Sequence, residues 1–403
     1  MPADLIKAFE RMAQYGTAPE DGCSRFGVGY ENAFERLKAR YLIGQFSRGD
    51  SSEKFVVGPY GAGKTHFLRQ LMEIGRAMDC VTSEVMLNKN VDFTRNLDVY
   101  RRVAAAVRCP ESDQRGIPSL FRQAYARVQA KAGDDPNARR MILEGWVRAL
   151  TDSDFNLASF ARVARRALDA LSEGADTEFE AACRWLEGNA DDKAVARAVG
   201  ESPVGKSESN SFGRDALFSL FQLIKRAGYR GTILGFDEAE QGLWADRQKT
   251  QRMLSQLQAD INAIADLKDG SALVVFAVTP DLIARMEEFA ALQQRVADAA
   301  PGQGFFDGND LAAKIDLTTD RDPIKDLRAI GRRLVDLYFA EVLKEGSSPK
   351  LEAVRGKATQ LADAVAATEA STSSRRTMAR QVCTMLLNDY GNGSPPPAAE
   401  PEV

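Results

Sequence analysis

One short turn, GPYGAGKT from Gly58 to Thr65, constrains the fold of this chain more than any other segment. It follows the apolar residues Phe55 to Val57 and precedes a segment with helical spacing, so it satisfies the pattern GxxxxGK[ST] between a strand and a helix. Backbone N–H groups at the start of such a helix close around phosphate oxygens. The turn therefore predicts a phosphate-binding loop in a parallel α/β fold.

The residue types in this loop match what a nucleoside triphosphate needs. Gly58, Gly61 and Gly63 let backbone N–H groups approach phosphate at positive φ. Lys64 supplies an ammonium for the β and γ phosphates, and the hydroxyl of Thr65 is a ligand for Mg²⁺. ATP and Mg²⁺ are the predicted cofactors. The predicted nucleotide-binding positions here are Gly58, Pro59, Tyr60, Gly61, Ala62, Gly63, Lys64, Thr65 and His66. A packing role is the more typical interpretation of His66.

A second apolar segment, ILGFDE from Ile233 to Glu238, ends in two carboxylates. Ligands of parallel sheets bind at the carboxyl ends of the strands, where this pair is expected. Asp237 is predicted to hold Mg²⁺ through water, and Glu238 to act as the general base toward the attacking water. A solvated turn is an equal alternative for the pair alone, but the intact phosphate loop favours catalysis. Glu240 is a third carboxylate of open role.

Thr279 ends a further apolar segment, SALVVFAVTP, and Arg295 follows in LQQRV. The segment is expected to neighbour the Asp237 strand through a βαβ crossover. Its Thr279 hydroxyl is predicted to meet the γ phosphate or the lytic water, and a Thr-Pro turn is the alternative. Arg295 is predicted as an arginine finger for the γ phosphate of a neighbouring subunit. A solvated surface arginine is the alternative.

Late in the chain, the segment SSRRTMAR begins a helix with two cations in its first turn. Arg375 and Arg376 oppose the preference of helix N-termini for negative charge. Their placement indicates an anionic partner, such as nucleotide phosphate. Surface decoration is the equal alternative, and the sequence does not distinguish which arginine would act.

Composition excludes little but narrows the setting. The 403 residues carry a formal charge of −4, so no global basic field indicates nucleic acid or a membrane surface. No apolar run reaches the length of a membrane span, and no membrane partner is expected. The five cysteines are scattered without a CxxC spacing, which fits a reducing compartment. We expect a cytoplasmic protein.

The order of the segments predicts an α/β P-loop NTPase with a parallel sheet, a long helical insert and a C-terminal helical lid. Strand and helix signals alternate around the phosphate loop and around Asp237, whereas only helix-period segments occur between Cys109 and Phe212. The predicted domains are an N-terminal helical segment at 1–50, an ATPase core at 51–320 with its insert at about 109–212, a helical lid at 321–390 and a disordered tail at 391–403.

These motifs, in this order, resemble AAA+ ATPases of the origin-recognition and STAND-like type. More narrowly, the chain resembles the ATP-binding proteins of bacterial BREX phage-defence systems, through GTAPEDGCSRFGVGYE, VVGPYGAGKTHFL, LGFDEAEQ, AVTPDL, ALQQRV and SSRRTMAR. The resemblance implies an AAA+-like fold with Walker A at the phosphate loop and Walker B at Asp237 and Glu238. It also implies sensor 1 at Thr279, a trans arginine finger at Arg295, sensor 2 at Arg375 or Arg376, and adenine contact by Gly27 to Glu31.

The leading hypothesis is an ATP-hydrolysing motor or switch in a DNA-directed defence complex. The implied partners are further copies of the chain, other defence-system proteins and duplex DNA. A nucleotide-gated interaction module with little turnover is the alternative. A small-molecule kinase is a third candidate, but the sequence shows no acceptor site. RVARR (Arg162 to Arg166), RAIGRR and Arg375 to Arg380 indicate DNA only weakly, because basic helical faces are usually solvated.

Overall fold

The chain groups into two compact units. The computed structural model describes residues 2–17, 19–87, 94–238, 247–298, 300, 302–318, 322–368 and 374–391. Unit 1 comprises Met1–Asn32, Pro59–Gln70 and Thr318–Val403, and unit 2 comprises Ala33–Gly58 and Leu71–Leu317. Each unit has its own hydrophobic core. The domain limits expected from the sequence stay predictions, because such a grouping does not test which parts fold alone.

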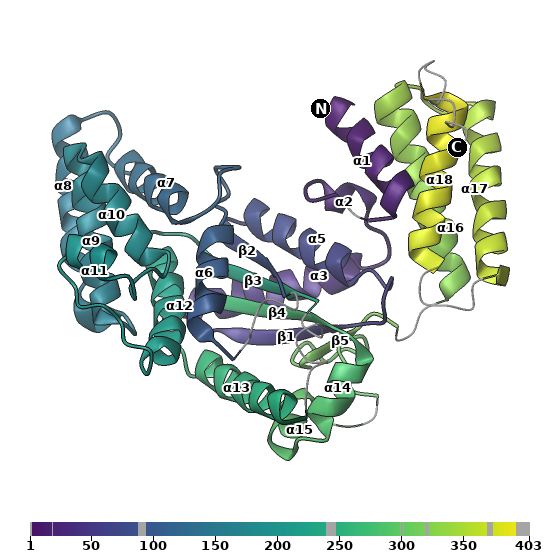
Figure 1. Cartoon of the computed structure of the whole chain (residues 1–403). Coiled ribbons are helices and arrows are strands. Elements are labelled where there is room, and N and C mark those ends of the chain that lie inside the picture. The colour runs from purple at the N-terminus through teal and green to yellow at the C-terminus, as the bar shows by residue number, and fades with distance from the viewer. Residues whose placement is uncertain are drawn as a thin grey trace, which may run out of the picture. The chain divides into compact units, whose positions relative to one another are not determined.

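Unit 2 is built on a five-stranded sheet in the order β2-β3-β4-β1-β5 (Figure 1). Its strands are β1 (Ser52–Val57), β2 (Cys80–Met86), β3 (Gly231–Asp237), β4 (Ala272–Val278) and β5 (Lys314–Asp316). Every neighbouring pair is parallel. The predicted fold class, an α/β P-loop NTPase-like core with a helical insert and C-terminal helices, is therefore confirmed.

Helices cover both faces of this sheet, which explains why its central strands are apolar on both sides. The helices are α5 (Lys64–Ala77) on one face and α6 (Asn96–Ala106), α12 (Ser209–Arg226) and α13 (Arg247–Ala265) on the other. Helix α5 approaches closely, since a Cβ on Gly75 would lie 2.3 Å from Cδ1 of Ile233. On the opposite face Phe55, Phe276 and Phe236 stack across β1, β4 and β3 with centroid separations of 5.3 and 5.1 Å.

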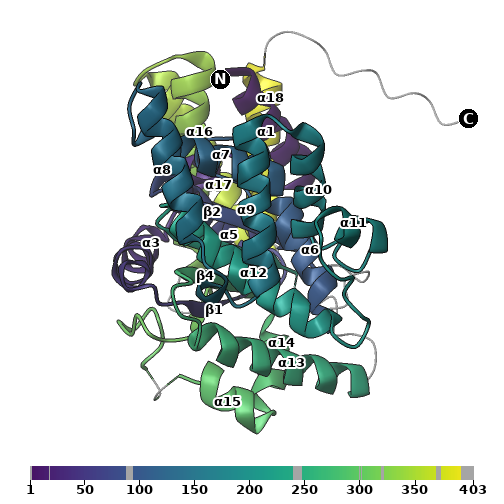
Figure 2. The same cartoon turned by 90° about the vertical axis from the view of Figure 1, so that its left-hand side faces the viewer.

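The predicted insert is mainly helical and extends from α6 and α12 (Figures 1 and 2). It contains α7 (Ile117–Ala130), α8 (Pro136–Ala149), η2 (Asp152–Asp154), α9 (Ala158–Glu173), α10 (Asp176–Leu186) and α11 (Lys193–Ala198). Its buried residues belong to the same hydrophobic core as buried residues of the sheet. Helices α6 and α12 touch backbone to backbone, because a Cβ on Gly213 would lie 2.3 Å from the nitrogen of Leu97.

Other short helices complete unit 2. They are η1 (Lys38–Gln45), α4 (Phe46–Arg48), α14 (Pro280–Glu287) and α15 (Ala290–Val296), together with α3 (Glu31–Leu37) from Ala33 onward. The sequence predicts one regular helix from Glu31 to Phe46, whereas η1 within it is π-helical. A π-helix widens the turn by one residue, and side-chain periodicity over so short a stretch does not reveal it.

Unit 1 is a helical bundle together with the phosphate loop. Its helices are α1 (Pro2–Tyr15), α2 (Cys23–Phe26), α16 (Pro323–Leu337), η4 (Tyr338–Leu343), α17 (Pro349–Thr368) and α18 (Ser374–Tyr390). A Cβ on Gly331 in α16 would lie 2.5 Å from Cε of Met378 in α18, so this glycine permits close helix packing. No helix within the described ranges is long and apolar enough to cross a membrane. Of the predicted tail, all but Gly391 falls outside the described residues.

Candidate functional site

Three predicted residues lie at neighbouring strand ends in unit 2. Gly58 follows β1, Asp237 ends β3 and Thr279 follows β4. Strand β4 pairs with both β1 and β3, so the three carboxyl ends share one edge of the sheet (Figure 1). The N–H of Gly58 donates to the carbonyl oxygen of Val278 at 3.1 Å, which fixes the start of the phosphate loop beside Thr279. This edge is where parallel sheets bind ligands.

The acidic pair combines a buried carboxylate with a strained backbone. Asp237 is 1% exposed, and its Oδ1 accepts the N–H of Glu238 at 3.0 Å. Glu238 has a φ of +56°, a left-handed conformation that costs a non-glycine residue about 1–2 kcal/mol. Backbone strain of this kind is enriched at functional sites. Glu240 falls outside the described residues.

Thr279 carries a hydroxyl that the fold leaves unsatisfied. The residue is 4% exposed, and it occupies the N-cap of α14 without making a side-chain cap hydrogen bond. Its Oγ1 is buried and has no hydrogen-bond partner among the described residues. Native proteins leave few buried polar groups in this state, so a ligand oxygen or a bound water is the expected partner. The Thr-Pro turn interpreted from sequence explains the backbone but not the orphaned hydroxyl.

The phosphate loop in unit 1 has the backbone that its sequence predicts, with one difference. Gly61 and Gly63 have φ values of +83° and +95°. Gly58 is not among the described glycines with positive φ, because it still continues β1 through its bond to Val278. Helix α5 begins at Lys64, so the positive end of its dipole directly follows the loop, which favours a phosphate there.

The side chains of the loop place one buried cation beside one exposed ring. Lys64 is 7% exposed, and its Nζ donates to the carbonyl oxygen of Pro59 at 3.2 Å. The same Nζ lies 5.3 Å from the ring centroid of Tyr60, which is 55% exposed. Thr65 and His66 follow in the first turn of α5 and are half-buried. A buried ammonium at the start of this helix is a suitable partner for phosphate.

Arg375 lies against this loop and Arg376 does not. The Nη1 of Arg375 donates to the carbonyl oxygen of Ala62 at 2.6 Å and to the hydroxyl of Tyr30 at 2.8 Å. Its Nη2 donates to Oδ2 of Asp326 at 2.5 Å. Burial acts to lower the pKa of Arg375, but Tyr30 and Asp326 outweigh it, so the pKa stays above its ordinary value. Arg376 is exposed.

Arg295 is an exposed residue on α15 in unit 2. Its charge reaches Glu53 at the start of β1, where burial raises the carboxyl pKa and the backbone, Lys54 and Arg295 act against that rise. The start of β1 is the opposite end of the strand from Gly58. An arginine finger that serves a neighbouring subunit is expected to lie away from the site of its own chain.

Two residues of the Arg375 cluster carried no individual prediction. Tyr30 lies within the segment Gly27 to Glu31, to which the family resemblance assigned adenine contact. Asp326 stands in the first turn of α16, where acidic residues are ordinary, so nothing in the sequence singles it out. Only the fold brings Asp326 into contact with Arg375, which lies 49 positions later in the sequence.

Several arginines of the basic segments that weakly indicated DNA are neutralised within the chain. Arg162 pairs with Asp152 and Glu201 at 3.1 and 2.8 Å. Arg165 pairs with Asp152 at 2.7 Å. In RAIGRR, Arg328 pairs with Asp363. Charges held in such pairs add little to the attraction of a phosphate backbone.

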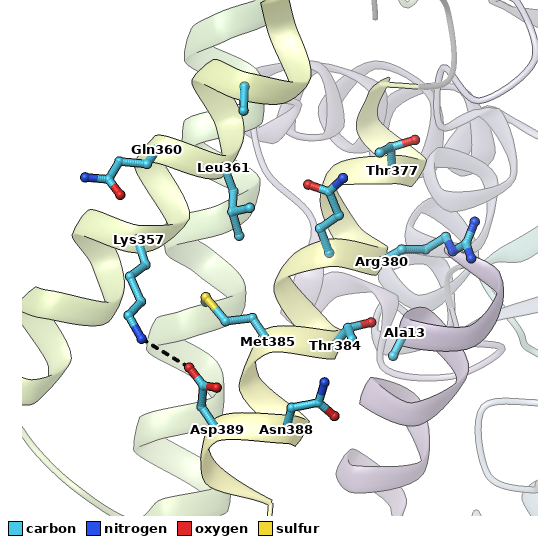
Figure 3. Close-up of a pocket in the computed structure, with 12 residues that line it drawn as sticks. Ala13, Lys357, Gln360, Leu361, Thr377, Arg380, Thr384, Met385, Asn388 and Asp389 are labelled. Carbon is cyan, nitrogen blue, oxygen red and sulfur yellow. Dashed lines mark hydrogen bonds and ion pairs between the residues drawn. The ribbon is translucent and has the colours of Figure 1, made fainter. Parts of the chain in front are cut away.

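A groove of about 850 Å³ in unit 1 runs between α17 and α18 (Figure 3). Leu361 and Met385 line it, and Lys357 closes one side through an ion pair to Asp389 at 3.2 Å. Arg380 from the third basic segment also lines this groove. None of the predicted nucleotide-binding residues borders it, so it is separate from the candidate site.

Comparison with protein-family models matches residues 3–389 to the family described as "BREX system ATP-binding protein BrxC/D". The match covers nearly the whole chain, including the phosphate loop, the acidic pair and Arg375. Comparison with curated proteins and with solved structures finds no match.

Proposed function

The chain belongs to the BREX system ATP-binding protein BrxC/D family, and we propose that it is a Mg²⁺-dependent ATPase that acts as a motor or switch in a phage-defence complex. One observation carries the hydrolytic part of this proposal. The buried Asp237 ends β3, and Glu238 follows it with a left-handed backbone. Strand β3 pairs with β4, and β4 pairs with β1, the strand that leads into the phosphate loop. A simple nucleotide-binding surface would not need strain at Glu238.

The residues present fit ATP and Mg²⁺. Gly61 and Gly63 hold the left-handed backbone that a phosphate cradle requires, and Lys64 is a buried cation that donates to the carbonyl oxygen of Pro59. The orphaned hydroxyl of Thr279 is satisfied if a phosphate or the lytic water lies next to it. When bound, Mg²⁺ would supply charge neutralisation between the β and γ phosphates. Thr65 and Asp237 are the residues proposed to hold it, Asp237 through water.

The chain's own groups would then divide the work. Lys64 would hold the β and γ phosphates, and Thr279 would orient the γ phosphate or the water. Glu238 would take a proton from that water as it attacks, and it would return the proton to solvent afterward. Arg295 of a second copy would stabilise charge on the transferred phosphoryl group, so the proposal includes a homo-oligomer.

A nucleotide-gated module with little turnover is the second candidate, and one contact favours it. Arg375 ties the phosphate loop to α16 and α18 within unit 1. Nucleotide at the loop would therefore alter the packing of these helices directly, and they would present a changed surface to another defence protein. Turnover is incidental in this scheme.

Association with other BREX proteins follows from membership of the system, and duplex DNA is proposed as one target of the complex. The support for DNA is the defence role, because many of the basic side chains pair internally. We also place the protein in the cytoplasm, on the ground that its five cysteines are free, buried thiols, as a reducing compartment favours.

The experiment compares ATP hydrolysis and assembly mass for the wild type, Lys64→Ala and Glu238→Gln, each with and without duplex DNA. The ATPase predicts turnover by the wild type only, with Glu238→Gln still binding ATP and accumulating as an oligomer. Binding without turnover by the wild type under every condition would favour the module. Stimulation by DNA that disappears at high salt supports DNA direction, and its complete absence at low salt contradicts it.

A further inference from the structure

Three segments of unit 1 meet at the guanidinium of Arg375. They are the loop between α2 and α3 through Tyr30, the phosphate loop through Ala62, and the first turn of α16 through Asp326. The Nη1 atom also lies 3.8 Å from the position that a Cβ on Gly63 would take. The guanidinium is therefore placed against the part of the loop where its left-handed glycines form the cradle.

Asp326 supplies the only carboxylate that Arg375 contacts among the described residues. The side chains of the pair are 20% and 16% exposed, so solvent screens their attraction less than it screens a surface ion pair. Position in the first turn of α16 also favours a negative charge at Asp326. A buried guanidinium that lost this partner would seek water, which means moving away from the loop.

Tyr30 fixes the same guanidinium from another direction. Its side chain is almost fully buried, and its ring meets the ring of Phe67 edge-on with centroids 5.3 Å apart. Phe67 lies in α5, one turn after the phosphate loop. The ring contact with α5 therefore fixes the position of the Tyr30 hydroxyl relative to the phosphate loop, and this hydroxyl accepts a hydrogen bond from Arg375.

Arg375 retains hydrogen-bonding capacity after these three contacts. A guanidinium has five N–H donors, and Tyr30, Ala62 and Asp326 use three of them. The other two have no partner within the described ranges. An anion can therefore bind without breaking the existing bonds, which makes Asp326 a support for Arg375 and not a competitor of the ligand.

We propose that Asp326 and Tyr30 are positioning residues that hold Arg375 on the phosphate loop, so that its remaining N–H donors meet a nucleotide phosphate. The inference rests on the proposed function, because it takes the loop to be the ATP site. It adds two residues that act through Arg375 and touch no nucleotide phosphate themselves.

The test measures the affinity of the full chain for ATP with Mg²⁺ by calorimetry, in a Glu238→Gln background that prevents turnover. Asp326→Asn, Arg375→Ala and the double variant form a cycle. Tyr30→Phe removes the accepting hydroxyl and keeps the ring on Phe67. Asp363→Asn is the matched control, since Asp363 pairs with Arg328 in the same bundle at 2.8 Å and is half exposed.

Asp326→Asn and Arg375→Ala are each expected to weaken ATP binding about tenfold, and Tyr30→Phe about threefold. The double variant should bind like Arg375→Ala alone, because a residue that acts only through Arg375 adds nothing once Arg375 is gone. Melting temperatures without nucleotide separate the stability cost of each substitution from its effect on ATP binding. A merely structural Asp326 would instead give additive effects on ATP affinity in the double variant.

The positioning role and the proposed ATP site are contradicted by different results. If the background protein binds ATP, Arg375→Ala binds it more weakly and Asp326→Asn binds it normally, the positioning role is wrong and the ATP site stands. If the double variant loses more affinity than Arg375→Ala, Asp326 acts independently and the inference is again wrong. If the background protein does not bind ATP, the proposed function fails and the inference fails with it.

Discussion

The side-chain amide of Gln256 donates to Oδ1 of Asp260 at 2.9 Å, at the edge of a small apolar pocket between α12, α13 and the sheet. Phe218 and Phe236 are among the residues that line this pocket. Burial raises the pKa of Asp260 to about 6, and Gln256 and Arg214 only partly oppose the rise. At neutral pH this carboxylate is charged, although its buried surroundings favour the neutral form.

Asp260→Asn is expected to stabilise the protein at pH 7.5 by about 2–3 kcal/mol, because it removes the charge and keeps an acceptor for Gln256. The folded state holds the proton of Asp260 more tightly than the unfolded state does. The contribution of Asp260 to the free energy of unfolding therefore falls as pH rises from about 4 to about 6 and then levels off. The gain from the substitution should therefore shrink at pH 4.5. Urea unfolding at both pH values measures it, with exposed Asp266→Asn as control. An equal gain at both pH values contradicts the assignment.

Thr279→Val should leave stability nearly unchanged and lower ATP turnover by tenfold or more. The substitution replaces a buried, unpartnered hydroxyl by a methyl group of the same shape, which costs the fold little. Turnover suffers because the γ phosphate or the lytic water loses a hydrogen bond. Urea unfolding and steady-state hydrolysis measure the two effects. A loss of stability above about 1 kcal/mol would show that the hydroxyl serves the turn into α14 instead.

Arg127 links the insert to the sheet. Its guanidinium pairs with Asp79, which precedes β2, and with Glu111 at 2.5 Å. It also lies 4.4 Å from the ring centroid of Tyr229. Arg127→Met, which keeps the apolar stem, is expected to cost about 2 kcal/mol of unfolding free energy.

The control for Arg127 is Arg140→Met on α8, whose pair with Glu144 at 2.8 Å is exposed and should cost under about 0.5 kcal/mol. Chemical unfolding of both variants gives the comparison. Equal costs would mean that the Arg127 contacts do not stabilise the junction of insert and sheet.

The sequence predicted the parts of the fold that local patterns encode. The phosphate loop lies between a strand and a helix as its motif requires, and the apolar segments that end at Asp237 and Thr279 are neighbouring central strands. The edge strand β5 escaped prediction because three residues, Lys314–Asp316, are too few to show an alternating pattern. It forms because β1 offers it a partner: the N–H of Phe55 donates to Ala313 at 2.8 Å.

The candidate site shows the same division between local and distant determinants. Lys64 and the glycines follow from one continuous motif. Which arginine of the pair after residue 374 faces the loop depends on the rotation of α18, and helix rotation is set by packing of Met378 and its neighbours in the bundle core. Asp326 carried no assignment, and Tyr30 carried only the adenine contact that the resemblance implies for Gly27 to Glu31, because the role proposed for both exists only through contacts with Arg375.

Arg295→Ala is expected to lower ATP turnover by a hundredfold or more while ATP affinity stays within about threefold of wild type. An arginine finger stabilises charge that develops in the transition state, so its loss slows hydrolysis more than it weakens binding. Its exposed position on α15, near the start of β1, is available to a second copy of the chain. Gln294→Ala, exposed on the same helix, is the control.

Mixing the two inactive variants tests whether Arg295 acts in trans. Arg295→Ala has an intact ATP site, and Lys64→Ala retains an intact Arg295, so a mixed oligomer pairs a working site with a working finger. We expect turnover in the mixture to rise well above the sum of the separate proteins. No recovery, with mixed oligomers confirmed by mass measurement, would mean that Arg295 serves its own chain or the assembly interface. A parallel loss of ATP affinity in Arg295→Ala would make it a structural residue.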